Sequence, residues 1–375
     1  MDGFDSGFGW KKNWAESRQH FIDWWNRKGL VVSTWGAQCK ARVPHAVLPD
    51  EAPGNKHVPP HEWPRLQYED VEGRAAKMWQ HYSRMDYGLD IVPIADTNIG
   101  PGSLALALGC VPGFSPETVW FDPAWKDVAD VRDIPPIRFN PQARWWQVHE
   151  EQIRAHNRHA KGAYLTGLPD LVENVDILSS LRDPQTLMMD MLENPEWVEE
   201  SVMAINCAWF EAFDRLRALA KGPDGGNAWC AFNLWGPGKT AKVQCDACAM
   251  FSPEMFDRFV TPALTEQCEW LDNSLYHLDG TQCIVHLDAL LKIEPLDGIE
   301  WTPQSGAEPG WHERWHPLYK RVLDAGKSLQ VVGVPVEKID FVLNVTGTQG
   351  VYIVTEINNP DDMARAAKIL EKWRT

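Results

Sequence analysis

The sequence has no long apolar run and is short of positive charge. No apolar stretch approaches the roughly 18 residues that a membrane-spanning helix needs, and no secretory pattern opens the chain. Its 36 lysines and arginines stand against 52 aspartates and glutamates, a net charge of −16, and no basic block interrupts this composition. A protein that grips phosphates needs local positive charge, so nucleic acid and anionic membranes are disfavoured as partners. We expect a cytoplasmic protein that acts on a small molecule.

The sequence also lacks the motifs of several common classes of site. Its eight cysteines are scattered through predicted helices and strands, which suits reduced thiols better than a disulfide framework. Cys245 and Cys248 form a lone CxxC pair, which is weak evidence for zinc or redox chemistry. Gly100-Pro101-Gly102 follows a predicted strand but has the wrong spacing for a dinucleotide loop. The missing GxGxxG element argues against a doubly wound open sheet.

Tryptophan is unusually frequent, with 20 copies. Trp14, Phe21 and Trp25 recur at roughly helical spacing, so residues 1–28 predict a helical lead-in. The proline-rich segment 43–64 predicts an insertion or arm rather than a linker between domains. We expect most tryptophans in the core and a few around a pocket for a flat, sugar-like or cationic group.

Short β-rich runs alternate with helical segments along the rest of the chain. The eight runs are 29–36, 89–96, 162–170, 227–236, 274–280, 297–304, 328–335 and 350–356. Several helices begin with a capping residue and a proline, as at Ser252-Pro253 and Asn359-Pro360. This alternation implies parallel strands with right-handed crossovers, and eight such strands can close into a barrel. We therefore predict an α/β fold: a single (β/α)₈ TIM barrel over residues 1–375 with an N-terminal helical extension.

Polar residues at the predicted strand ends are the candidate site, because the active site of such a barrel lies at the carboxyl ends of its strands. The catalytic candidates are His277, Asp96 and Asp246, and the substrate-binding candidates are Trp35, Asp170, Asn233, Trp235, Trp301 and Gln304. Carboxylates that share one mouth cannot all stay ionised, so either a cation lies among them or one has a raised pKa. The simpler alternative for each single aspartate is that it caps a helix or closes a turn. In YHLDG (276–280), we expect His277 to face the mouth and Gly280 to permit the turn.

Four segments carry a family resemblance: 90–110, 170–183, 244–264 and 276–306. They resemble the uroporphyrinogen decarboxylase superfamily and are most similar to its corrinoid-dependent methyltransferase-like branch. The resemblance covers roughly residues 10–375 and implies the same barrel. Porphyrinogen decarboxylases hold a polycarboxylate with an arginine-rich loop after the first strand. The segment TWGAQCKARVPH (34–45) lacks that loop, so a polyanionic porphyrinogen is a poor substrate.

The methyltransferase branch binds zinc through a His-x-Cys pair and a second cysteine near the end of the eighth strand. Here these places read His277-Leu278-Asp279 and Thr355-Glu356, so the resemblance implies a metal set of His277, Asp279 and Glu356. Such a set can hold zinc, and also manganese or iron, and it suits an oxygen- or nitrogen-linked substrate better than a thiol.

Three hypotheses follow. The first is a methyltransferase that moves a methyl group between a small O- or N-methylated substrate and a corrinoid on a partner protein, with a divalent metal such as zinc as cofactor. The second is a decarboxylase or lyase of a small acid that uses Asp96 and His277 as an acid/base pair. The third is a non-catalytic barrel that only binds a ligand.

Overall fold

The computed structural model describes residues 9–35, 63–115, 118–222 and 224–374. The first eight residues of the predicted lead-in and nearly all of the predicted insertion, 43–64, lie outside these ranges.

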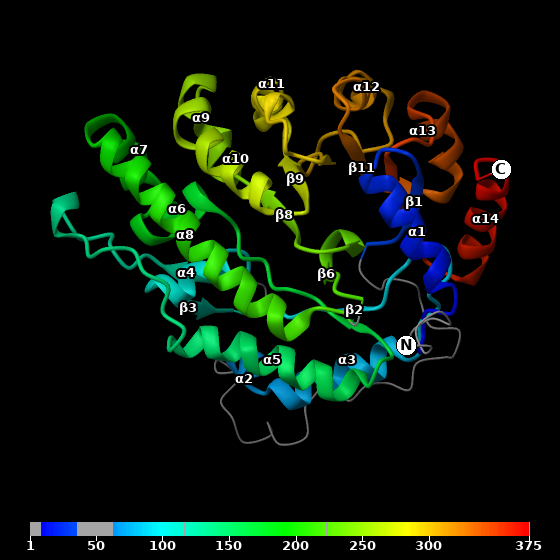
Figure 1. The fold of residues 1–375 in the computed structure, drawn as a ribbon, viewed down its shortest axis with the longest axis horizontal. Helices are drawn as coiled ribbons and strands as arrows, with labels where there is room; N and C mark the ends of the chain where they lie inside the picture. Colours follow the sequence, from blue (N-terminus) through cyan, green and yellow to red (C-terminus); the bar gives the residue numbers. More distant parts are fainter. Residues whose placement is uncertain (1–8, 36–62, 116–117, 223, 375) are drawn as a thin grey trace.

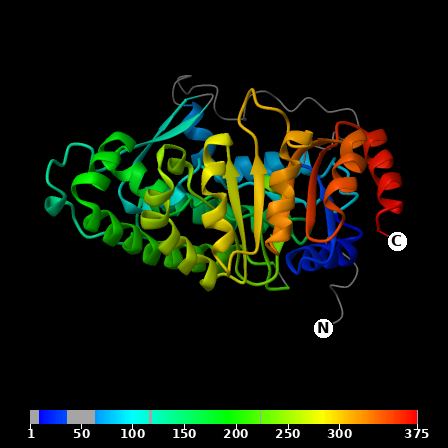
Figure 2. The ribbon, with the colours of Figure 1, turned by 90° about the horizontal axis from the view of Figure 1, so that it is seen from above.

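A six-stranded parallel sheet forms one side of the molecule, with the strand order β1-β12-β11-β10-β9-β8. Its strands are β1 (Leu30–Ser33), β8 (Thr240–Gln244), β9 (Asn273–Asp279), β10 (Gly298–Thr302), β11 (Ser328–Pro335) and β12 (Val351–Glu356). Figures 1 and 2 show the helices of the C-terminal half arranged along the outside of these strands. We call this sheet the ladder side.

The other side of the fold is built from much shorter strands. Parallel β2 (Ile94–Ala95) and β5 (Leu165–Thr166) form one pair, and antiparallel β6 (Asn227–Trp229) and β7 (Leu234–Gly236) form another. We call residues 90–103, 165–170 and 227–236 the loop side. Two residue pairs connect the two sides at their edges. The Asp90 amide donates to the Val32 carbonyl (2.9 Å) and the Val32 amide donates to Asp90 Oδ2 (2.8 Å), while the Thr240 amide donates to the Asn227 side chain (3.0 Å), whose Nδ2 donates to the Thr240 carbonyl (2.5 Å).

The described residues therefore contain no closed sheet, and the predicted eight-stranded barrel is not confirmed. What the structure does show is a mixed α/β fold with a parallel sheet, an arrangement consistent with a TIM-like barrel. The run 227–236, predicted as the fourth strand, is instead a short hairpin broken by a 3-10 turn. The strand beside β9 is β8, which the sequence interpretation missed.

The helices that follow the strands begin largely where their capping signals predict. Asp183, Ser252 and Asn359 each accept a backbone hydrogen bond at the start of the helices that begin at Pro184, Pro253 and Pro360. The helices are α1 (Trp14–Trp25), α2 (Trp63–Glu69), α3 (Val71–Tyr82), α4 (Ser103–Leu108), α5 (Arg144–Ala160), α6 (Asn174–Arg182), α7 (Pro184–Glu193), α8 (Pro195–Ala220), α9 (Pro253–Phe259), α10 (Thr261–Trp270), α11 (Leu287–Lys292), α12 (His316–Asp324), α13 (Ile339–Thr346) and α14 (Pro360–Glu371). A β3–β4 hairpin (Val111–Phe114, Val119–Asp122) follows α4. No helix within the described ranges is long and apolar enough to cross a bilayer.

Helix α1 lies within the predicted lead-in and packs against both sides of the fold. The Trp25 indole donates to the Trp235 carbonyl (3.0 Å), and the Ser328 hydroxyl at the start of β11 donates to the Trp24 carbonyl (2.6 Å). These contacts bury α1 aromatics against β7, β11 and β12.

Strand register decides which side chains face the interior. Gln244, His277, Glu300, Gln330 and Tyr352 lie directly opposite one another on five neighbouring strands. Because side chains alternate along a strand, this row shares one face, and the residues beside it face the helices. The interior of the ladder side is therefore polar along this row.

Candidate functional site

A cavity of about 410 Å³ opens beside the ends of β8, β9 and β10. Its lining residues come from both sides of the fold: Trp35, Asn98, Gly100, Pro101, Asp170, Trp229, Ala231, Phe232, Gln244, Asp246, His277 and Thr302. Of the predicted site residues, Trp35, Asp170, Asp246 and His277 line it. The turn after β9 follows expectation, since Gly280 has φ +79°.

His277 is held by a buried carboxylate that the sequence interpretation missed. Its Nδ1 forms a short hydrogen bond with Glu300 Oε2, and Glu300 is fully buried. Thr302 Oγ1 donates to the other oxygen of Glu300 (2.6 Å). Burial alone would lower the pKa of His277, but the charge and hydrogen bond of Glu300 more than offset it, so that pKa is raised. The Nδ1 contact leaves Nε2 available to the cavity.

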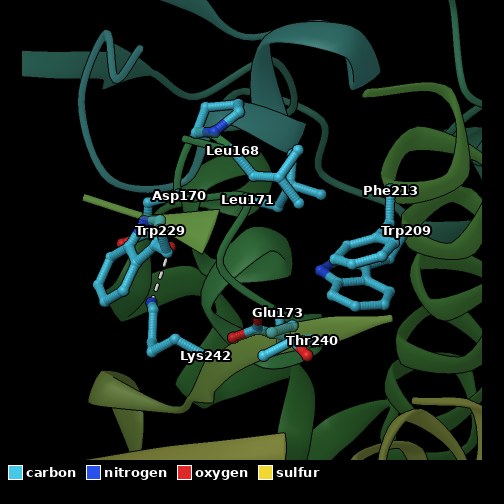
Figure 3. Close-up of a pocket in the computed structure, with 11 residues that line it drawn as sticks. Leu168, Asp170, Leu171, Glu173, Trp209, Phe213, Trp229, Thr240 and Lys242 are labelled. Atoms are coloured by element: carbon cyan, nitrogen blue, oxygen red, sulfur yellow. Dashed lines mark hydrogen bonds and ion pairs between the residues drawn. The ribbon is translucent and has the colours of Figure 1, made fainter. Parts of the chain in front are cut away.

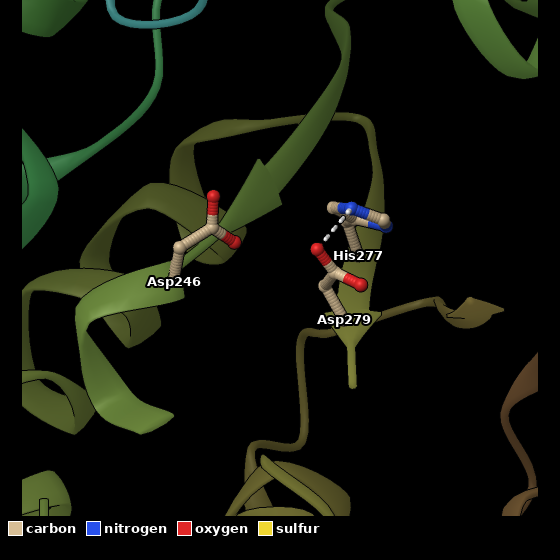
Figure 4. Close-up of side chains that lie close together, drawn as sticks. All are labelled: Asp246, His277 and Asp279. Carbon is tan, nitrogen blue, oxygen red and sulfur yellow. Dashed lines mark ion pairs between the residues drawn. The ribbon is translucent and has the colours of Figure 1, made fainter. Parts of the chain in front are cut away.

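Asp246 and Asp279 complete a group around this imidazole. One ligand atom from each of Asp246, His277 and Asp279 lies within 4.8 Å of the others, and His277 Nε2 is 4.0 Å from Asp279 Oδ2. Figure 4 shows the Asp246 carboxylate reaching toward the two residues of β9 from the neighbouring strand end. Within the described residues this is the one group of three or more potential metal-ligating side chains.

Asp246 is fixed from two directions. Gln244 Nε2 donates to Asp246 Oδ2 (2.7 Å), and the Asp246 amide donates to Asp176 Oδ2 (2.8 Å). Asp246 is exposed as a whole residue. Partial desolvation of its carboxylate raises the pKa of Asp246, while His277 and Lys242 act in the opposite direction.

A buried lysine on β8 links the ladder side to the loop side. Lys242 Nζ donates to Asp170 Oδ1 (2.7 Å) and makes a short hydrogen bond with Gln244 Oε1. Figure 3 shows this ion pair beside Trp229, and Glu173 also lines the void of about 30 Å³ there. Burial alone would lower the pKa of Lys242, but the charge and hydrogen bond of Asp170 help to offset it, so that pKa is raised. Burial also raises the pKa of Glu173, which favours its neutral acid form.

Phe232 covers His277 from the loop side. Its ring centroid lies 5.0 Å from that of His277 and 4.7 Å from that of Trp35. Its φ of +61° is a left-handed conformation that a bulky residue rarely adopts. The Phe232 carbonyl accepts hydrogen bonds from Gln330 Nε2 (3.0 Å) and the Tyr352 hydroxyl (2.9 Å), so two ladder-side residues hold this backbone in place.

Two predicted tryptophans do not reach the cavity. Trp301 is fully buried on the helix-facing side of β10, where its ring lies 4.9 Å from that of Trp315. Trp235 is fully buried against α1, with Trp14 at 5.1 Å and Phe21 at 6.1 Å between ring centroids. Both are core residues, and the prediction that they bind substrate is corrected.

Asn233 and Gln304, predicted to bind substrate, make hydrogen bonds that connect parts of the fold. Asn233 Oδ1 accepts from the Ser33 hydroxyl (2.6 Å) and the Val92 amide (2.8 Å), which joins β1 to the loop side. Gln304 Oε1 accepts from the Thr281 hydroxyl (2.8 Å) and ties together the turns after β9 and β10. Neither residue lines the cavity.

Three predicted carboxylates also lie outside the cavity lining, and of these only Asp279 belongs to the group around His277. Asp96 accepts from the Asn98 amide (2.9 Å) and lies 3.7 Å from Arg74, so it closes a turn after β2. Glu356 is exposed at the end of β12, and β10 and β11 stand between β12 and β9. Glu356 is therefore not part of the group around His277, and Asp246 takes its place.

Comparison with known proteins adds one finding. No protein-family model matches the sequence, and no curated protein matches it. Among solved structures, the chain is similar to a methyltransferase from Methanosarcina mazei, with a TM-score of 0.58 and 12% sequence identity. The match covers 96% of this chain and 99% of the other. At this identity the likeness shows a shared fold over nearly the whole chain.

Proposed function

We propose that the protein is a methyltransferase that moves a methyl group between a small O- or N-methylated substrate and a corrinoid carried on a partner protein. The observation that carries the proposal is the pairing of His277 with buried Glu300, which leaves Nε2 beside Asp279 and beside Asp246, which lines the cavity. The shared fold with a methyltransferase supports it.

The same group fits a divalent metal. An imidazole whose far nitrogen is bonded to a carboxylate is the usual form of a metal-ligating histidine, since the carboxylate fixes the ring and raises its basicity. His277 Nε2 with oxygens of Asp246 and Asp279 forms a nitrogen and oxygen set that suits zinc, manganese or iron(II). When bound, such an ion would polarise the heteroatom that carries the methyl group.

The chain's own residues would then orient the reactants and exclude water. Glu300 holds the His277 ring, and Gln244 holds the Asp246 carboxylate. Trp35 and Phe232 present an apolar wall beside the imidazole, which would shield the heteroatom from solvent and strengthen every charge interaction within the cavity. The corrinoid would approach through the open mouth.

The lyase hypothesis has less support. It requires Asp96 and His277 to act on one substrate, but Asp96 does not line the cavity and is engaged with Arg74 and the Asn98 amide. The carboxylates grouped around His277 are Glu300, Asp246 and Asp279, a set better suited to holding a cation.

The proposal is tested by metal content and methyl transfer together. Purified protein is loaded with zinc, manganese or iron(II) and dialysed, and its metal is measured by elemental analysis. The loaded protein is then mixed with free cob(I)alamin and a panel of methylated amines and methyl ethers, and consumption of the cob(I)alamin absorption band is followed. We expect about one ion per chain and turnover of at least one substrate class.

His277→Ala should remove both metal and turnover, whereas His159→Ala, on α5 and outside the cavity, should change neither. Thermal unfolding checks that both variants are folded. Equal metal in the wild-type protein and His277→Ala, or no turnover by metal-loaded wild-type protein with any substrate, would contradict the proposal.

A further inference from the structure

Lys242 and Gln244 form a chain of hydrogen bonds that ends on the Asp246 carboxylate. Lys242 Nζ bonds to Asp170 and to Gln244 Oε1, and Gln244 Nε2 donates to Asp246 Oδ2. Lys242 is only 6% exposed and Gln244 also 6%, so bulk water competes little with these contacts. Neither residue belongs to the group around His277.

The chemistry of the lysine fixes the direction of the amide. An ammonium group has donors only, so it selects the oxygen of the Gln244 side chain. The amide nitrogen must then face the other way, toward Asp246, and it donates there. Without Lys242 the amide could rotate by half a turn and present its oxygen to Asp246, which would be repulsive while that carboxylate is ionised.

The Gln244 backbone is fixed separately. Its amide donates to Glu173 Oε2 (2.8 Å), and β8 pairs with β9 so that Gln244 lies opposite His277. The backbone position of Gln244 is therefore fixed without Lys242. Lys242 restricts the rotation of the side-chain amide. The amide holds Oδ2 of Asp246 and makes no hydrogen bond to Oδ1.

We propose that Lys242 is a positioning residue that acts through Gln244 to set the Asp246 carboxylate as a cation ligand. This inference rests on the metal site of the proposed function. It gives a role to Lys242, which is buried and is not itself one of the proposed metal ligands. Residues that orient a metal ligand typically contribute about 10–100-fold to metal affinity.

Charge alone predicts the opposite effect of removing Lys242 on cation affinity. Lys242 is close enough to act on the charges of both Asp246 and His277. Removal of its positive charge should therefore strengthen cation binding if charge alone mattered. A loss of affinity in Lys242→Met would have to come from lost orientation.

The test is a double-mutant cycle measured with zinc alone, by competition against a chromophoric chelator. We expect Lys242→Met and Gln244→Met each to lower zinc affinity about 10–100-fold. Because the two residues act in series, the double variant should be no weaker than the weaker single variant. Lys239→Met, which removes a partly exposed lysine just before β8, should bind zinc as the wild-type protein does.

The outcomes separate the two proposals. If the wild-type protein binds no zinc, manganese or iron(II), the proposed function fails. If it binds zinc and Gln244→Met binds equally well, or Lys242→Met binds more tightly, the positioning role is overturned. Losses that add in the double variant would likewise overturn it. Gln244→Met keeps the buried ion pair, so it decides the question even if Lys242→Met does not fold.

Discussion

The ladder side and the loop side contribute to the same cavity in different ways. Strands β8 to β12 have five to eight residues each, and their register is continuous except for a shift between Val331 and Val334 of β11. The loop-side strands have two or three residues. The ladder side therefore supplies His277 and Glu300, and the turn directly after β8 supplies Asp246. The relative positions of these three side chains must be precise. The loop side supplies Phe232 and Asp170, a wall and a counter-charge, which tolerate irregular backbone.

The comparison implies that the loop side is kept in place by a few polar anchors rather than by a ladder. Lys242 on the ladder side pairs with Asp170, and Asn233 on the loop side bonds to Ser33 of β1. Lys11, before α1, bonds to carbonyls of residues 87 and 89, ahead of the loop side. Changing one anchor at a time should reveal how much each contributes.

The largest expected effect is that of Lys242→Met on stability. It leaves Asp170 largely buried without its cation, and removal of one partner of a buried pair typically costs about 3–5 kcal/mol. Lys239→Met is the matched control, because its partner Asp214 is more than half exposed, and it should change the free energy of unfolding by less than about 1 kcal/mol. Urea unfolding measures both. A cost of the Lys242 change no larger than that of the control would show that this anchor is dispensable.

Lys11 should give the next largest effect, and its effect depends on pH. Lys11 is fully buried, and burial lowers the pKa of Lys11 to about 8 from 10.5. Between these two values the unfolded chain keeps a proton that the folded chain releases, so the free energy of unfolding should rise with pH across that window. The rise is up to about 3 kcal/mol.

The measurement compares wild-type protein and Lys11→Met by urea unfolding at pH 7.5 and at pH 10. Subtracting the free energy of unfolding of one protein from that of the other removes the contribution of the other groups that titrate in this range. We expect the wild-type protein to gain stability relative to Lys11→Met as the pH rises. A difference that stays constant would mean that Lys11 has an ordinary pKa.

The same contrast explains what the sequence could and could not predict. His277 was found because it ends a clear apolar run, and strand ends gather at one edge of a parallel sheet. Glu300 was missed, and Trp301 was chosen, because alternation along β10 decides which of the two faces inward. A shift of one residue in the strand register exchanges the inward and outward positions. The pairing of Glu300 with His277 in β9 shows that Glu300 faces inward.

Strand β8 was missed because its inward residues, Lys242 and Gln244, make TAKVQ look polar. Its outward residues are small or apolar, so a strict period-2 reading could have found it. The predicted runs 89–96 and 162–170 contain β2 and β5, but only two residues of each run pair as a strand. The alternation of strands and helices therefore predicts a closed barrel, whereas the described residues contain no closed sheet. Asn233 was taken for a site residue since its true role, bridging two segments distant in sequence, depends on tertiary contacts alone.

Asn233→Ala should have a smaller effect than the two lysine changes. It removes the acceptor of the Ser33 hydroxyl and both partners of the Val92 backbone, at a cost of about 2 kcal/mol. Asn26→Ala, at an exposed position after α1, should stay within about 0.5 kcal/mol of the wild-type protein. Chemical denaturation of both variants provides the comparison. If the two costs were equal, Asn233 would not be an anchor of the loop side.

The smallest expected effect is that of Glu356→Gln on zinc affinity. Two strands separate β12 from β9, and at about 4.8 Å per strand Glu356 starts too far from His277 to share an ion with it. Glu356→Gln should therefore change zinc affinity less than about twofold. Asp246→Asn, which replaces one ligand oxygen with an amide nitrogen, should lower zinc affinity at least about tenfold. Chelator competition ranks the two variants, each checked for folding by thermal unfolding. A larger loss in Glu356→Gln than in Asp246→Asn would restore the ligand set expected from the sequence, and it would mean that the end of β12 moves toward β9 when the metal binds.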